Sequence, residues 1–95
     1  MPKGYLIAQT VVTDPEAWGR YVEKTKPALA KFGGIPIARG GRCEIPEGNG
    51  FSRNVIIEFP SYEAALGYAR SPEYADAKAL RQDAGIMNMT IVEGI

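Results

Sequence analysis

The sequence predicts an α+β fold in which two βαβ halves share one antiparallel sheet, and three observations predict it. First, the stretch "VVTDPEAWGRY" is echoed half a chain later by "EFPSYEAALGY", which aligns Glu16 with Glu63 and Tyr21 with Tyr68. Second, stretches typical of strands and helices follow one another in the order βαββαβ. Third, 95 residues, of which 45% are hydrophobic, suit a single globular domain over 1–95.

The first half reads as a strand, a capped helix and a glycine stop. Residues 5–12 are β-branched, aromatic or small, as in a strand. Thr13 and Glu16 match a T-x-x-E capping box, which predicts a helix from there to about Phe32. Its apolar stripe recurs at three- and four-residue spacing, and Gly33-Gly34 supplies a left-handed end.

The second half repeats this plan with one interruption. "IPIARGGRCEI" (35–45) reads as a strand with a bulge or bend at Gly40-Gly41, and "RNVIIEF" follows after the turn signal "PEGNG". Ser61 is the expected N-cap of the second helix, and Ser71-Pro72 predicts a break near Arg70 followed by a new first turn. "MNMTIVEG" reads as the closing strand. The order is that of the ferredoxin-like split βαβ fold, with four antiparallel strands and the helices on one face.

Composition excludes several classes of function. Eleven acidic residues balance eleven basic ones, which argues against a nucleic-acid or anionic-membrane partner. The chain has no histidine, so a His-ligated haem, the usual zinc sites and Ser–His or Cys–His catalysis are excluded, and we expect no cofactor or metal. Cys43 is the single cysteine and cannot form an internal disulfide. We expect no signal peptide, no membrane span and a cytoplasmic location.

The predicted sheet is apolar on both faces. Whichever alternate set of residues faces the helices, the other keeps large apolar side chains, for example Ile7 or Leu6 in the first strand and Ile56 or Ile57 in the third. Exposed apolar patches of this kind usually mark an interface. We therefore predict a homodimer in which two sheets pack face to face.

The whole chain resembles the DUF1330 family of small bacterial proteins of unknown function. The resemblance rests on "KGYLIAQTVVTDPEAWGRY", "KFGG", "ARGG", "VIIEFPSYEAAL", "SPEY", "ALR" and the closing "VEG". It implies membership of the dimeric α/β-barrel superfamily, whose subunits join their sheets into one barrel. That superfamily includes cofactor-free monooxygenases on aromatic substrates, muconolactone isomerases and haem-handling enzymes, but none of their motifs transfers residue by residue.

Two arginines are the strongest candidates for a site. Arg39 and Arg42 lie in "ARGGRCE", where flanking glycines let a guanidinium offer its fork to a carboxylate or phosphate. The alternative is that they pair across strands with Glu44 or Glu58. Glu58, in the apolar run "VIIEF", is a candidate proton carrier if it is partly buried, and otherwise a solvated or paired carboxylate.

Other polar groups are candidates for lining a ligand pocket. Asn54 and Arg53 open the third strand and could line the mouth of the barrel, and the alternative, which we favour, is a role at the adjoining turn. Tyr5 begins the first strand, and its hydroxyl could point into a pocket. Trp18, Tyr21, Tyr68 and Tyr74 have helical spacing and are expected core anchors, although one hydroxyl such as that of Tyr68 could point into a pocket. Cys43 has no neighbour in sequence that would activate it.

Three functions remain open at this point. The first is a cofactor-free enzyme acting on a small aromatic or anionic metabolite in the barrel, with Arg39 holding the anion, Glu58 moving a proton and a tyrosine orienting the substrate. Arg42, Tyr5, Asn54 and Tyr68 are the expected ligand contacts. The second is a non-catalytic module that binds a small molecule. The third is a structural dimer whose barrel is filled by side chains.

Overall fold

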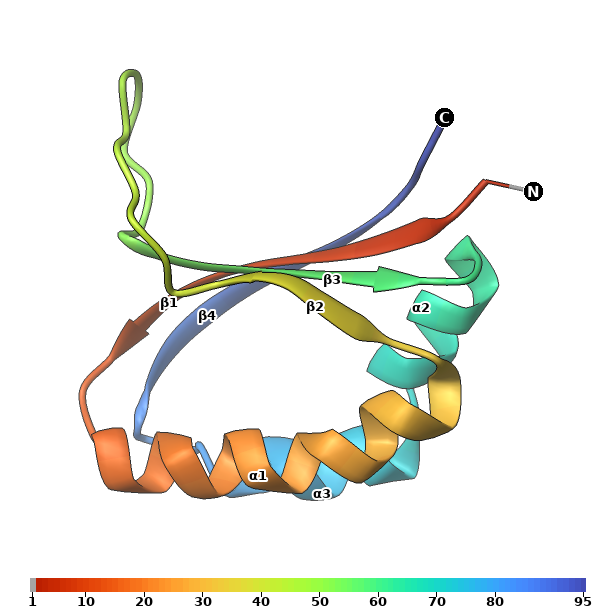
Figure 1. Ribbon diagram of the computed structural model, residues 1–95. Coiled ribbons are helices and arrows are strands. Elements are labelled where there is room, and N and C mark those ends of the chain that lie inside the picture. Colours follow the sequence, from red (N-terminus) through yellow and green to blue (C-terminus); the bar gives the residue numbers. More distant parts are fainter. Residues whose placement is uncertain (1) are drawn as a thin grey trace.

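The computed structural model describes residues 2–95 and has a four-stranded antiparallel sheet with the strand order β2-β3-β1-β4 (Figure 1). The predicted order of elements and the ferredoxin-like fold are confirmed. The elements are β1 (Gly4–Val12), α1 (Pro15–Phe32), β2 (Ile35–Arg39), β3 (Arg53–Phe59), α2 (Tyr62–Ala69), α3 (Pro72–Ala79) and β4 (Gly85–Glu93). No helix among these residues is both long and apolar enough to cross a bilayer.

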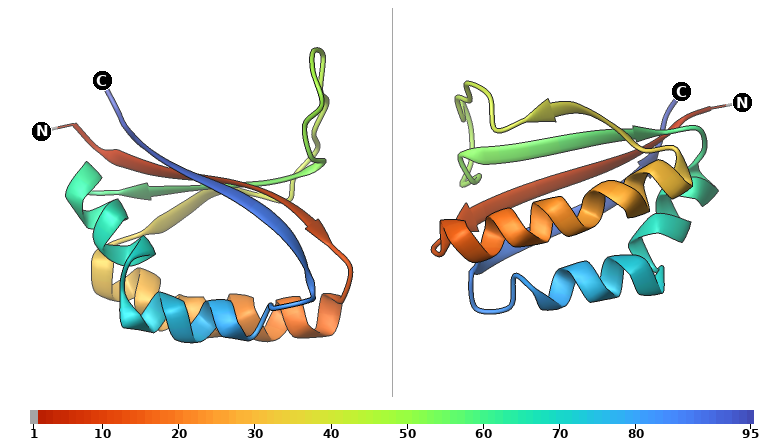
Figure 2. Two further views of the ribbon diagram at one scale, coloured as in Figure 1. Left: turned by 180° about the vertical axis from the view of Figure 1, so that it is seen from behind. Right: turned by 60° about the horizontal axis from the view of Figure 1, so that its bottom comes forward.

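The helices cover one face of the sheet and leave the other bare (Figure 1). The register decides which side chains face them: Leu6 pairs with Ile57, and both are buried under the helices, whereas Ile7 pairs with Ile56 on the opposite side. We call that opposite side the open face. In the right-hand view of Figure 2, α1 and α3 lie side by side, and the edge strand β2 extends beyond α1 without a helix over it.

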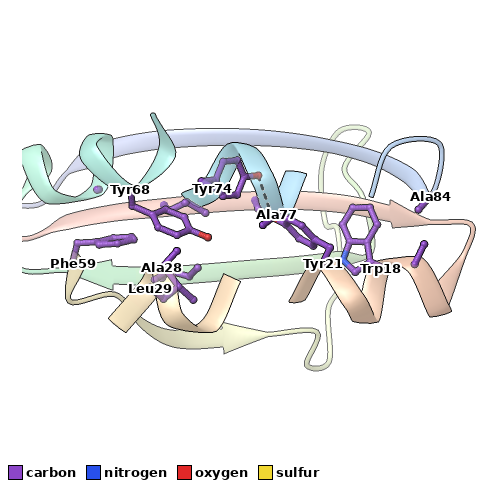
Figure 3. Packing of buried hydrophobic residues seen from close by; sticks show 14 residues of the cluster. Trp18, Tyr21, Ala28, Leu29, Phe59, Tyr68, Tyr74, Ala77 and Ala84 are labelled. Atoms are coloured by element: carbon purple, nitrogen blue, oxygen red, sulfur yellow. Dashed lines mark hydrogen bonds between the residues drawn. The ribbon is translucent and has the colours of Figure 1, made fainter. Parts of the chain in front are cut away.

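Aromatic side chains fill the space between sheet and helices. Trp18, Tyr21, Phe59, Tyr68 and Tyr74 are all at most 6% exposed, which confirms the expected core anchors. Figure 3 shows these rings in a row, and neighbouring rings meet edge-on or tilted at centroid distances of 5.2–6.2 Å. Such geometry brings the positive edge of one ring against the negative face of the next, which adds to the stabilisation from burial.

The helix starts follow the capping rules, with one correction. The N-cap of α1 is Asp14 and not Thr13: its carboxylate accepts a hydrogen bond from the backbone of Ala17. Asp14 is the better placed residue because Pro15 at the next position suits the first helical turn. Ser61 and Ser71 cap α2 and α3 as predicted, each accepting from the backbone N–H three residues on.

The second strand is shorter than the sequence predicts. β2 ends at Arg39, Gly40 adopts a left-handed φ of 68°, and residues 40–52 form an arm that projects from the sheet on the side of the open face (Figure 1). The expected strand to Ile45 is therefore wrong. Of the bulge or bend expected at Gly40-Gly41, the bend is present at Gly40. A bulge lies earlier in the strand, between Pro36 and Ala38.

The open face carries a stripe of apolar side chains. Ile35 is 60% exposed and Ile86 57%, and Val11 and Val92 are also exposed, with Ile7 and Ile56 half-buried between them. The prediction that this face stays apolar is confirmed. Solvent-exposed sheet faces are normally polar, so the stripe is an exception that needs an explanation.

Candidate functional site

A small cavity lies between α1 and the sheet. Its volume is about 50 Å³. Pro36 and Arg39 of the edge strand form its outer side, and both are exposed, so the cavity opens between α1 and β2. The wall is mostly apolar or aromatic and includes Leu6, Ala8, Trp18, Tyr21, Val22, Thr25, Leu29, Arg53, Val55, Ile57, Tyr68, Met87 and Met89.

Two arginines lie at this cavity and both are without an acidic partner. Arg39 pairs in register with Val55, and Arg53 precedes Val55 by two residues, so all three side chains lie on the helix-covered face. The ion pairs among residues 2–95 are Lys3–Glu58, Lys26–Glu23 and Lys31–Glu73, and none involves either arginine. Two arginines at one cavity without a counter-ion attract an anion, since each guanidinium group offers planar donors that match a carboxylate.

The bulge in β2 decides where the Arg39 side chain points. Ile35 pairs with Glu58 on the open face, so strict alternation would place Arg39, four residues on, on that same face. The extra residue between Pro36 and Ala38 reverses the alternation and turns Arg39 to the cavity side. Arg39 and Glu58 therefore lie on opposite faces of the sheet, and one chain does not bring them into a common site.

The predicted site residues divide between three places. Arg39 and Tyr68 line the cavity. Tyr5 and Glu58 pair with each other in register on the open face, where the carboxylate of Glu58 accepts a hydrogen bond from Lys3 Nζ at 2.7 Å. This contact holds the pKa of Lys3 above its usual value. Arg42 lies on the exposed arm, away from the cavity lining.

Asn54 supports the base of the arm. It pairs with Gln9 on the open face, and its Nδ2 donates to the carbonyl of Phe51 and to Cys43 Sγ, both at 3.2 Å. These contacts hold the arm against the start of β3, which is a turn-side role. Cys43 itself is exposed, and its hydrogen bonds among residues 2–95, to the carbonyl of Glu44 and from the amide of Asn54, involve no cationic group.

A hydrogen-bonded group of two tyrosines and an arginine extends outward from Tyr21 in the cavity wall. The hydroxyls of Tyr21 and Tyr74 are 3.1 Å apart, and Arg81 Nη2 donates to Tyr74 at 3.2 Å. The Arg81 guanidinium also stacks over two rings, 5.1 Å from the centroid of Tyr21 and 5.6 Å from that of Trp18. Arg81 was not a candidate from sequence; its position seven residues after Tyr74, about two helical turns, was the available signal.

Burial keeps the cavity's phenols neutral. It raises the pKa of Tyr21 and of Tyr68 well above the ordinary value of 10.0, since a phenolate would lose its hydration there. Both groups are therefore hydroxyls over the whole physiological range. Among residues 2–95, no three His, Cys, Asp or Glu side chains come together in a group that could hold a metal ion.

Solved structures with the same fold include proteins of quite different description. A protein of unknown function from Rhodopseudomonas palustris is 18% identical, with a TM-score of 0.77 over 99% of this chain and 83% of that one. The cofactor-independent oxygenase SnoaB from Streptomyces nogalater is 10% identical, with a TM-score of 0.65 over 97% and 92%. A dimeric protein of unknown function and ferredoxin-like fold from Bacteroides fragilis is 18% identical, with a TM-score of 0.54 over 96% and 95%.

The comparisons by sequence identify a family but no characterised relative. At such low identities the structural likeness shows the fold alone, and a search of curated proteins found no match. One family model matches residues 3–95, which is nearly the whole chain. The chain belongs to this family, which is described as a domain of unknown function, DUF1330.

Proposed function

We propose that the cavity binds a small organic anion, with Arg39 and Arg53 holding the anionic group at its mouth. The observation that carries this proposal is that two arginines line one apolar cavity and neither takes part in an ion pair among residues 2–95. An apolar pocket with a few convergent polar groups is the usual form of a small-molecule site. A carboxylate satisfies both arginines and carries an apolar part into the space behind them.

The size of the cavity favours a short ligand over an aromatic ring. Its volume of about 50 Å³ is well below the roughly 150 Å³ of an engineered apolar cavity that takes up benzene. It is also below the roughly 300 Å³ at which drug-sized ligand pockets begin. A carboxylate with a chain of a few carbons fits this space, with its charged end in the open mouth.

A homodimer completes this proposal. The open face is apolar, and the arm projects on the same side of the sheet (Figure 1). A second copy that covers this face would therefore also lie beside the arm. A neighbour of the same fold is described as dimeric. In such a dimer Tyr5, Asn54 and the Lys3–Glu58 pair face the partner, so their proposed role is at the interface. The cavity stays on the far side of each sheet and opens to solvent.

A cofactor-independent enzyme on the same cavity is the second candidate. The observation that favours it is a neutral phenol of Tyr21 in the cavity wall, tied to a cation through Tyr74, because such a hydroxyl can stabilise charge that develops on a bound oxygen. SnoaB, of the same fold, is described as a cofactor-independent oxygenase. This likeness is one of fold and raises only the expectation that the architecture can support such chemistry.

The binding proposal is tested by titrating short carboxylates from acetate to pentanoate against the protein, followed by heteronuclear NMR. We expect saturable shifts in residues that line the cavity. Arg39→Gln and Arg53→Gln should each weaken binding by roughly 10- to 100-fold, the loss of a charge-assisted hydrogen bond. Raising the salt concentration should weaken binding to the wild type more than to the double variant.

Arg70→Gln is the matched control, because Arg70 is an exposed arginine at the junction of α2 and α3 and is not part of the cavity wall. It should leave the affinity unchanged. Carboxylate shifts that map to the open face, or that persist in the Arg39→Gln/Arg53→Gln double variant, would contradict the proposed site.

A further inference from the structure

We infer that Tyr21 donates a hydrogen bond to an oxygen of the bound anion inside the cavity, and that Arg81 positions and polarises this donor through Tyr74. The inference rests on the proposed function and narrows its ligand class. The ligands we expect are small carboxylates that carry one more oxygen outside the carboxylate group, such as oxo or hydroxy acids. Tyr21 lines the cavity, whereas Tyr74 and Arg81 lie behind it. Arg81 contacts Tyr74 and Tyr74 contacts Tyr21, so the three form a chain that ends at the cavity wall. Figure 3 shows the Tyr21–Tyr74 part of this chain.

The direction of this chain follows from counting protons. Arginine has no acceptor, so Arg81 must donate and the Tyr74 oxygen must accept. The single proton of Tyr74 then goes either to the Tyr21 oxygen at 3.1 Å or to the thioether of Met87 at 4.0 Å. Without a ligand, both protons have an acceptor if Tyr21 donates to Tyr74 and Tyr74 donates to Met87. A hydroxyl oxygen is a better acceptor than a thioether, so Tyr74 turns its proton to Tyr21 once a ligand oxygen accepts the proton of Tyr21.

A ligand oxygen in the cavity can take the place of Tyr74 as acceptor of the Tyr21 proton. The Tyr21 oxygen then accepts from Tyr74, which gives up its weak thioether acceptor for a hydroxyl. The hydrogen bond to the ligand is therefore gained without leaving a buried donor unpaired. Met87, which contacts the Tyr74 hydroxyl, also lines the cavity, so the pair of hydroxyls lies at the wall.

The cation at the far end makes this donor stronger. Arg81 is partly buried over two aromatic rings and takes part in none of the ion pairs among the described residues. Its charge is therefore not neutralised by a carboxylate, and it acts on the two hydroxyls in series. Hydrogen bonds in such chains strengthen one another. The same charge favours ligand oxygens that carry, or develop, negative charge.

The test compares three acids of one chain length: pentanoate, 2-oxopentanoate and 4-oxopentanoate. Dissociation constants are measured by NMR titration of the wild-type protein and of Tyr21→Phe, Tyr74→Phe and Tyr62→Phe. We expect the wild type to bind one oxo acid roughly 3- to 10-fold more tightly than pentanoate, the worth of one hydrogen bond. Tyr21→Phe should abolish this preference and keep the affinity for pentanoate within about twofold.

Tyr74→Phe separates positioning from structure. It keeps the Tyr21 hydroxyl but removes its link to Arg81, so the preference for the oxo acid should be reduced but not abolished. A general loosening of the core would instead weaken the binding of all three acids to the same extent. Tyr62→Phe, outside the cavity, should change nothing. A wild type that binds all three acids equally, or a Tyr21→Phe variant that keeps the preference, overturns this inference and leaves the arginine site standing. If none of the acids binds, the proposed function fails and this inference falls with it.

Discussion

Ile7 and Ile56 are paired directly across β1 and β3, and both side chains point away from the helices. They lie at the centre of the open face, half-buried, with more exposed apolar groups such as Ile35 and Ile86 toward its margins. The centre of an apolar patch is where a partner removes water most completely. A charge placed there should therefore separate association from folding.

Ile56→Lys is expected to convert the proposed dimer into a folded monomer. Burying an unpaired ammonium in an interface costs several kcal/mol, which weakens the dimer by roughly two orders of magnitude or more. In the monomer the same ammonium remains in water. Light scattering coupled to size-exclusion chromatography measures the mass, and circular dichroism checks the fold. Ala75→Lys, on the exposed surface of α3, is the matched control and should leave the mass unchanged.

Gly85 and Gly19 should respond to alanine in opposite directions. Gly85 has φ 155° and its added Cβ would lie 2.1 Å from the carbonyl oxygen of Val11, so the start of β4 would have to move. We expect Gly85→Ala to lower the free energy of unfolding by roughly 2–4 kcal/mol. Gly19 is exposed within α1 with nothing within 4 Å, so Gly19→Ala should raise it by about 0.5–1 kcal/mol. Urea unfolding measures both; equal effects would contradict the packing described at Gly85.

The sequence was sufficient for the fold because its signals are local. Strand stretches, serine caps at Ser61 and Ser71 and the break near Arg70 each depend on a few adjacent residues. The alternation in β1 also showed that the open face would be apolar. The N-cap at Asp14 was missed by one position, which is the ordinary uncertainty of a helix end.

The site was harder to predict because its geometry depends on non-local events. Arg39 faces the cavity only because of the bulge after Pro36. The bulge arises from the pairing of β2 with β3, and no residue type at that position predicts it. Without it, the proposed pairing of roles between Arg39 and Glu58 would have been geometrically reasonable. The contact of Arg81 with Tyr21 likewise joins two helical segments far apart in sequence, so it follows from packing and not from a motif.

Stability should fall at alkaline pH because of the buried phenols. The pKa values of Tyr21 and Tyr68 are raised in the folded state by burial, so the unfolded chain loses these protons first, from about pH 10 upward. Below that pH both states are protonated and stability is unaffected by these groups. Above it, each tyrosine lowers the free energy of unfolding by up to about 1.4 kcal/mol per pH unit.

Tyr68→Phe should therefore flatten the alkaline slope, and the comparison of urea midpoints between about pH 8 and pH 11 measures it. The variant loses its share of the slope, and every other titratable group is common to both proteins. Tyr62→Phe, at a half-exposed tyrosine of α2, is the control for the effect of the substitution itself. Parallel curves for wild type and Tyr68→Phe would show that Tyr68 has the same pKa in both states.

Thr10 and Thr25 offer a matched pair of buried hydroxyls with opposite expectations. Thr10 is 1% exposed and its Oγ1 has no hydrogen-bond partner, whereas Thr25, 7% exposed, donates to the carbonyl of Val22 at 2.6 Å. Valine has nearly the same shape as threonine. Thr10→Val should therefore raise the free energy of unfolding by roughly 1–2 kcal/mol, since it removes a buried group that is not compensated.

Thr25→Val should instead lower the free energy of unfolding by about 0.5–1.5 kcal/mol, the net worth of one hydrogen bond. Denaturant unfolding of both variants in parallel measures the difference, and the sign of the Thr10 effect decides the matter. If Thr10→Val destabilises the protein, then its hydroxyl is satisfied in solution, for example by a water at the end of the sheet next to Arg53, its register partner on β3.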